Sequence, residues 1–322
     1  MNKMYSIVFS LSVAAVTASA AVTPGLLNLV MPDATVVSGM NVAQSITSPF
    51  GQYIMSQMQS NDAGFLQFIA STGFDPSKDL LEILAATPST AASTSHSGLI
   101  LGRGVFQPAM IVGAATQEGG VITNYRGFSL IGPPPSQSGD NFALAFLDGA
   151  TAAMGDAGSI KSVIDRKLAG SKFSGALADA AVAVSNANSA WFATTTPLSD
   201  FMSTKQAGNL SGVAQSPLLQ SVLQATGGVQ FGTAGITLSA DAVTASPQNA
   251  QALVDVIKFF VSMIAGNANA PASVTSVASS AQFSVNGSTA HISLMLAENQ
   301  AEQLLMPQNA AKRLRKPVVI QK

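Results

Sequence analysis

Residues 141–168 constrain the fold more than any other stretch of this chain, because two strand signals there run directly into a helix signal. Residues 142–147 are β-prone, Asp148-Gly149 favours a turn, and a second short run ends before Gly155. Asp156 can then cap a helix by accepting a backbone N–H of its first turn. The apolar positions that follow recur on one helical face: Ile160, Val163, Ile164 and Leu168. Strand, turn, strand and helix are therefore expected in one continuous piece.

A related cap recurs at the four sites where proline follows serine or aspartate: Ser48-Pro49, Asp75-Pro76, Ser216-Pro217 and Ser246-Pro247. Proline suits the first helical turn because its φ is already set, so four helices are expected to begin at these sites. The first two predict helices throughout residues 48–86. The last leads into a long apolar run, which we interpret as a mostly buried helix rather than a membrane span.

Strand signals follow one another at short intervals, at residues 99–106, 108–112, 121–131 and 229–244. Successive short strands favour antiparallel pairing. The sequence therefore predicts an α+β fold, in which helices pack on a face of one or more antiparallel sheets. Laying Asp156 on Ser246 as equivalent caps also places Asp165 on Asp255, which hints at two similar halves.

Residues 277–296 have the pattern of a hairpin centred on Asn286-Gly287, a dipeptide preferred in two-residue turns. In that register Val285 faces Ser288 and Phe283 faces Ala290, so one face of the hairpin is apolar. The opposite face is polar and holds His291 opposite Gln282. We expect this polar face to be solvated.

The N-terminus has the pattern of an export leader, with Lys3, an apolar run over residues 4–16 and the small residues Ala18-Ser19-Ala20. The apolar run is shorter than the roughly 20 residues that span a bilayer, so cleavage after Ala20 is expected rather than anchoring. The protein is therefore predicted to be periplasmic or extracellular. The expected divisions are a signal peptide (1–20), a first α+β half (21–175), a second α+β half (176–306) and a basic disordered tail (307–322).

The charge content limits the classes of partner. The chain has no cysteine, only 10% charged residues, and 15 basic against 16 acidic residues. It therefore has no broad positive field to attract nucleic acid, and nucleic acid is not expected as a partner. A surface this close to neutral lacks charge repulsion between copies, which favours self-association. The tail is the one weak candidate for contact with an anionic surface, through Lys312, Arg313, Arg315 and Lys316.

Candidate catalytic and metal-binding residues are few. His96 lies in a low-complexity segment, and neither it nor His291 has the spacing of a metal ligand or a catalytic base. The densest acidic set is Asp148, Asp156 and Asp165, a weak candidate for a metal site or an acid–base pair. A turn residue, a helix cap and a helix-surface residue explain these three individually. No catalytic residue and no cofactor is therefore assigned.

Several segments resemble a family of uncharacterised secreted bacterial proteins common in soil acidobacteria. They are FLD, TAAMGD and IKSVIDR, which end at Asp148, Asp156 and Arg166, together with DATVVSGMNVAQS, SPFGQYI and GFDPSKDL nearer the N-terminus. The similarity covers most of the mature chain. These motifs consist of turn, cap and core residues, so the resemblance implies a fold but no known activity and no site.

Three hypotheses follow for the function. The first is a non-enzymatic exported protein that acts by binding or assembly in the cell envelope or outside the cell. The second is a carrier of an apolar small molecule, held between helices and sheet by residues such as Met55, Phe65, Phe68, Phe259 and Phe260. The third, ranked last, is a hydrolase that uses the three aspartates.

Overall fold

The computed structural model describes residues 21–53, 63–88, 98–134, 142–197, 217–233, 235–267, 272–297 and 300. The expected leader, Met55, His96 and the basic tail lie outside them.

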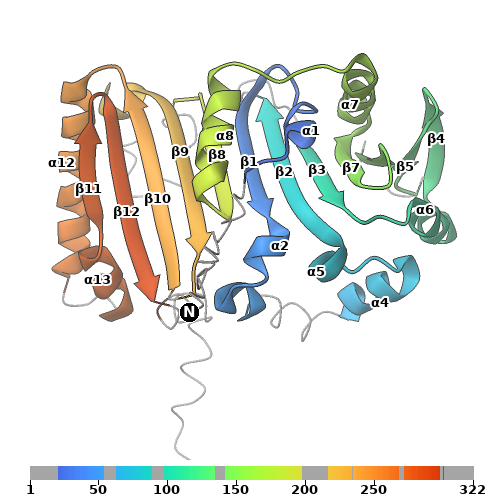
Figure 1. Ribbon diagram of the computed structural model, residues 1–322, viewed down its shortest axis with the longest axis horizontal. Helices are drawn as coiled ribbons and strands as arrows, with labels where there is room; N and C mark the ends of the chain where they lie inside the picture. The colour runs from blue at the N-terminus through green and yellow to red at the C-terminus, as the bar shows by residue number, and fades with distance from the viewer. Residues whose placement is uncertain are drawn as a thin grey trace, which may run out of the picture.

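The described strands form one twelve-stranded antiparallel sheet, and helices pack on it (Figure 1). Its order is β11-β12-β10-β9-β8-β1-β2-β3-β7-β6-β5-β4. This confirms the α+β class predicted from the sequence. In chain order the strands are β1 (Ala34–Asn41), β2 (Leu80–Pro88), β3 (Leu99–Gly104), β4 (Val121–Tyr125), β5 (Phe128–Gly132), β6 (Phe142–Phe146), β7 (Thr151–Asp156), β8 (Ala190–Thr194), β9 (Val222–Phe231), β10 (Gly235–Thr244), β11 (Gln282–Asn286) and β12 (Thr289–Ala297).

The helices range from single turns to five turns. They are α1 (Pro24–Leu27), α2 (Val42–Ser45), α4 (Ala63–Thr72), α5 (Pro76–Asp79), α6 (Pro108–Gln117), α7 (Ala157–Ala169), α8 (Ala176–Ala187), α11 (Pro217–Gln220), α12 (Pro247–Ala265) and α13 (Ala272–Ser279). A further helical stretch covers residues 49–53. No helix in the described part of the chain is long and apolar enough to cross a membrane.

The strand–turn–strand–helix prediction at residues 141–168 is confirmed. β6 and β7 pair through a turn, and α7 follows directly. Asp156 caps α7, because its Oδ1 accepts the N–H of Ser159 at 2.9 Å. The helix ends at Gly170, whose φ of 61° is the left-handed conformation that glycine adopts without a Cβ penalty.

The proline-marked helix starts are correct in position, but two of the predicted lengths are wrong. α5 and α11 are single turns, and strands β2 and β9 follow them where the sequence favours helix. Residues 80–88 therefore do not belong to a helical segment over 48–86. The short strand expected at residues 108–112 is also wrong, since Pro108 begins helix α6.

The two faces of the sheet are covered by different helices. Trp191 of β8 pairs with Gly39, and this row continues through Leu84 and Leu101 to Ala153 on one face. Helices α1, α7 and α8 cover that face, because their apolar residues form one core cluster with this row. Along each strand, the residues that alternate with this row point to the opposite face. There α12 packs on Ala225 and Ala290. We call these the α8 face and the α12 face.

The order of elements repeats on the two sides of the central β1–β8 pair. Outward from the centre the strands run β1-β2-β3-β7-β6-β5-β4 on one side and β8-β9-β10-β12-β11 on the other, so the first five strands on each side can be compared. In each series the third strand leads into a helix that begins with proline, at Pro108 and at Pro247. Asp156 caps the helix that follows β7, the fourth strand of its series. Ser246 caps the helix that follows β10, the third strand of its series. The two caps therefore do not occupy equivalent positions in the two series, and the similarity of the two halves stays a prediction.

The C-terminal hairpin forms, but its register differs from the predicted one. Val285 pairs with Ala290 rather than Ser288, and His291 pairs with Ser284 rather than Gln282. The two residues of the turn are Gly287 and Ser288, because Gly287 with φ of 56° takes the first turn position. The turn lies one residue later than predicted, so each residue pairs with a partner two positions further along β12. A shift of two residues keeps every side chain on its face, so one face stays apolar and the other polar.

Helix α12 is not mostly buried. Ala250, Leu253 and Val254 face the sheet, while Phe259 and Met263 are 62% and 56% exposed. The apolar run therefore contains one stripe that packs on β10 and β12 and another that faces outward.

Candidate functional site

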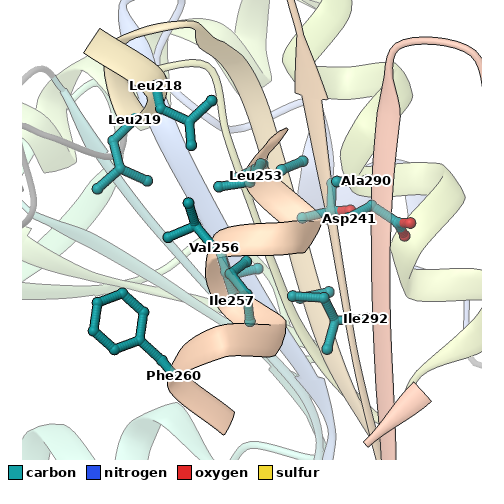
Figure 2. A pocket seen from close by; sticks show the side chains of 14 residues that line it. Leu218, Leu219, Asp241, Leu253, Val256, Ile257, Phe260, Ala290 and Ile292 are labelled. Atoms are coloured by element: carbon teal, nitrogen blue, oxygen red, sulfur yellow. The ribbon is translucent and has the colours of Figure 1, made fainter. Parts of the chain in front are cut away.

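An apolar cavity lies between helix α12 and the sheet, and its volume is about 210 Å³ (Figure 2). Strands β9, β10 and β12 form its floor with alanines, namely Ala225, Ala240, Ala242 and Ala290. Larger side chains of α11 and α12 form its walls, among them Leu219, Leu253, Ile257 and Phe260. Because the floor residues are small and the wall residues are large, the helix cannot settle fully onto the strands. The cavity follows from this mismatch.

The one charged residue at the cavity, Asp241, does not make it polar. Asp241 alternates with Ala240 and Ala242 along β10, so its carboxylate lies on the α8 face, away from α12 (Figure 2). There its Oδ1 lies 2.7 Å from Nδ1 of His291 on β12. The side chains that surround the cavity thus offer a ligand almost no hydrogen-bond partners.

The apolar surface continues beyond the cavity along the same face of the sheet. Phe192 of β8 lines the cavity and is 41% exposed. It begins a cross-strand row on the α12 face that runs through Ser38, Ala85, Ile100, Met154, Leu144 and Ile131. Ile100 is 40% exposed in this row. A surface suited to hydrocarbon therefore extends from the cavity across the centre of the sheet.

The structure brings together only part of the apolar set suggested by the sequence. Phe260 lines the cavity, whereas the neighbouring Phe259 is exposed on the outer side of α12. Met55 and the side chains of Phe65 and Phe68 lie outside the described part. The alanines of the floor were missed. In the sequence, their only signal is that they alternate with other residues along the strands. The same alternation occurs in any half-buried sheet, so it does not indicate a cavity.

The three candidate aspartates each contact a different partner. Asp148 accepts the N–H of Ala150 and pairs with Lys167, while Asp156 caps α7. Asp165 accepts the hydroxyl of Tyr125 and pairs with Arg126. Among the described residues no group of three histidines, cysteines or acids has the geometry to hold a metal ion. Burial acts to raise the pKa of Asp148, but hydrogen bonds from Lys167 and Ala150 outweigh it and leave the pKa below its ordinary value.

His291 has one feature of a catalytic histidine and lacks the others. Asp241 orients its Nδ1, and Ser284 lies directly across the hairpin from it. No hydrogen bond joins Ser284 to His291 in the described structure, and the side chains of His291 and Asp241 are 40% and 42% exposed. A nucleophile needs a base within hydrogen-bond reach and a site that excludes water, and the described Ser284–His291 pair has neither feature.

Comparisons with known proteins define the fold and no more. No family model and no curated protein sequence matches this chain. Solved structures similar to it include crystal form IV of TP0453, with a TM-score of 0.54, and crystal form III, with a TM-score of 0.52. Each is 11% identical and covers 89% of this chain and 98% of the other. The chain therefore shares its overall fold with TP0453 along nearly the whole length of both.

Proposed function

We propose that the protein is a non-enzymatic binding protein that carries an apolar small molecule in the cavity beneath α12. The observation that carries this proposal is the composition of the cavity, whose floor is alanine and whose walls are leucine, isoleucine and phenylalanine. Water in such a space finds no hydrogen-bond partners, so a hydrocarbon group can replace it at little cost.

The size of the cavity defines the class of ligand. A cavity of about 150 Å³ lined by similar side chains holds benzene. The 210 Å³ beneath α12 suits a small ring system or a segment of alkyl chain. The exposed row from Phe192 to Ile100 adds contact surface for a longer chain that leaves the cavity. The uncharged surroundings favour a ligand whose buried part is uncharged.

The site of action in this proposal is the periplasm or the exterior of the cell. Its support is the leader pattern of Lys3, residues 4–16 and Ala18-Ser19-Ala20, which lies outside the described residues. A chain without cysteine suits an oxidising compartment because no thiol can be cross-linked there. The resemblance to uncharacterised secreted proteins agrees with this assignment and adds no ligand.

Binding of a neutral fluorescent probe, N-phenyl-1-naphthylamine, tests the proposal on the mature chain. We expect saturable binding with enhanced fluorescence. Ala242→Leu adds a side chain from the floor of the cavity and should reduce probe affinity at least tenfold, because the added atoms occupy the binding volume. Ala240→Leu, on the same strand and at the same cavity, should act in the same direction.

The matched control is Ala252→Leu, which adds the same side chain to the exposed side of α12 and should leave probe affinity unchanged. Thermal melts of all variants establish that each is folded. Equal probe binding by the wild type and both floor variants would show that the cavity is not the binding site. Native mass spectrometry of the purified wild type should reveal a bound apolar molecule that the floor variants lack.

A further inference from the structure

A second cavity, of about 360 Å³, lies on the opposite face of the sheet in the other half of the molecule. Its walls are α1, the end of β3, the turn that leads into β7, the C-terminal part of α7 and the segment that follows α7. Four basic side chains line it: Arg103, Arg166, Lys167 and Lys172. Asp148 is the acidic residue in the lining. We call this cavity the cationic cleft.

The positive charge of the described structure is concentrated there. The described residues contain eight lysines and arginines: Lys78, Arg103, Arg126, Lys161, Arg166, Lys167, Lys172 and Lys258. Four of these eight line one cleft, in a chain whose net charge is −1. Glu82 pairs with Arg103 and Asp148 pairs with Lys167, so the four cations leave an excess of two positive charges, on Arg166 and Lys172. A solvated surface gives no reason for half of the cations to gather in one concavity.

Arg166 is the side chain that most needs an anionic partner. It is partly buried on α7, and its Nε donates to the carbonyl of Leu29 at 3.0 Å. Burial lowers the pKa of Arg166, with Asp33 and Asp165 acting more weakly in the opposite direction. Among the described residues no carboxylate pairs with Arg166 or with Lys172. A desolvated guanidinium without a carboxylate leaves strong hydrogen-bond donors for a ligand.

The other side chains of the cleft are held in place by the fold. The buried carboxylate of Glu82 accepts from Nε of Arg103 at 3.1 Å and from the backbone N–H of Thr23 at 2.9 Å. Asn28 accepts the N–H of Phe173 at 3.1 Å, which ties the segment after α7 to α1. Lys167 pairs with Asp148 at the rim. Arg103, Arg166 and Lys167 are therefore positioned before any ligand arrives, which reduces the entropy that binding must overcome.

We propose that the cationic cleft binds a phosphate group, either as free phosphate or as the head of a phosphorylated molecule. A phosphate monoester carries close to two negative charges, which two unpaired cations, Arg166 and Lys172, can balance. Arginine also matches the spacing of two phosphate oxygens through two parallel N–H groups. This site is independent of the proposed carrier function, because the two cavities lie on opposite faces and share no residue.

Titration calorimetry on the mature chain tests the proposal with two soluble probes, inorganic phosphate and glycerol 3-phosphate. A parallel assay measures sedimentation with vesicles of phosphatidylcholine that contain or lack phosphatidic acid. Binding of both soluble probes identifies free phosphate as sufficient. Binding only to vesicles with phosphatidic acid identifies a lipid headgroup. The proposal requires that binding in either assay depend on the cleft residues.

Two variants and one control define that dependence. Lys172→Gln and Arg166→Gln should each raise the dissociation constant about tenfold, since each removes a charge-assisted hydrogen bond. Lys161→Gln removes one positive charge from the exposed side of α7, the helix that carries Arg166. This control should leave the dissociation constant unchanged. Asp148→Asn should tighten binding, because it removes the carboxylate of the lining and frees Lys167.

The sign of the Asp148→Asn effect separates a binding site from a loss of structure, since a general disturbance of the cleft would weaken binding in every variant. Lys172 is exposed, so its variant is expected to fold even if Arg166→Gln does not. The proposal is overturned if neither phosphate nor vesicles bind, or if Lys161→Gln weakens binding as much as Lys172→Gln does.

Discussion

The indole ring of Trp191 lies directly over Gly39 at the centre of the sheet. They pair across β1 and β8, and a Cβ built on Gly39 would lie 2.5 Å from Cζ2 of Trp191. Trp191 is 6% exposed and belongs to the larger core cluster. A glycine is therefore required here by the ring that lies over it. Its own backbone torsion is ordinary, since φ of Gly39 is not positive.

Gly39→Ala should lower the free energy of unfolding by about 1–3 kcal/mol, because the indole ring must move out of a packed position. Urea denaturation followed by the fluorescence of Trp191, the only tryptophan, measures the change. The emission maximum of the folded variant should also shift, since the ring leaves its present surroundings. Gly149→Ala is the control, because a Cβ there meets no atom within 4 Å. Equal stability of Gly39→Ala and wild type would contradict the argument.

Single-residue roles were predictable where they depend on neighbours in the sequence. Asp156 and Ser246 were recognised as caps because the groups they bond lie three residues further on. The cleft cations could not be recognised, since Arg103 and Lys172 come from strands and loops that only the sheet order brings together. The partner of His291 was missed for the same reason, because Asp241 lies on a strand 50 residues earlier.

At the scale of whole elements, the proline caps locate helix starts but not helix lengths. The run that follows α5 is rich in leucine, which favours helix, yet it forms β2. Alternate residues of β2, Glu82, Leu84 and Ala86, are buried against the α8 face, and β1 and β3 satisfy its backbone on both sides. Pairing on two sides outweighs a propensity of a few tenths of a kcal/mol per residue.

The single turn α5 should nevertheless contribute to stability through its cap. Asp75 accepts the N–H of Ser77 at 3.0 Å, and hydrogen bonds from Lys78 and Ser77 lower its pKa. Asp75→Ala should therefore reduce the free energy of unfolding by about 1 kcal/mol at neutral pH. Because the folded-state pKa lies below the unfolded one, this contribution is complete only well above the unfolded pKa of about 4 and is lost as the pH falls through the folded value.

Urea denaturation of wild type and Asp75→Ala at pH 7, 4 and 2.5 measures this dependence. The difference between the two proteins should be largest at pH 7 and smallest at pH 2.5. Lys78→Ala should have a much smaller effect at every pH, because the side chain of Lys78 is 78% exposed. A difference that stays constant with pH would show that the carboxylate charge does not contribute.

Helix α12 should respond differently to substitutions on its two sides. Leu253 is 3% exposed and contacts the sheet, so Leu253→Ala should cost about 2–5 kcal/mol of unfolding free energy. Phe259→Ala removes a larger side chain that is 62% exposed, and its cost should stay within about 0.5 kcal/mol. Chemical denaturation compares the two. A cost for Phe259→Ala close to that of Leu253→Ala would mean that the outer stripe is covered in solution.

At the scale of the whole molecule, the two series of strands are one structure. β1 pairs with β8 over five residues, from Val36 with Thr194 to Met40 with Ala190. Helix α8 covers the junction, since Leu177 and Ala181 share a core cluster with Val37 of β1 and Ala193 of β8 (Figure 1). The sequence indicated the two series but could not indicate this junction, because short strands give no signal for their partners. Because this core cluster crosses the β1–β8 junction, neither series unfolds without exposing part of the other.

The two halves should therefore unfold in one cooperative transition. Leu101 is fully buried in β3, in the same cross-strand row as Trp191 but three strands away from β8. Leu101→Ala should lower the free energy of unfolding by about 2–5 kcal/mol. In a single transition, this loss must shift the urea midpoint seen by Trp191 fluorescence as far as the midpoint seen by far-UV circular dichroism. Independent halves would leave the Trp191 midpoint of Leu101→Ala at the wild-type value and split the dichroism curve into two steps. For wild type, Leu101→Ala and the surface variant Phe259→Ala, the fluorescence curve and the dichroism curve of each protein should coincide. This result would establish that the β1–β8 junction couples the two cavities within one folding unit.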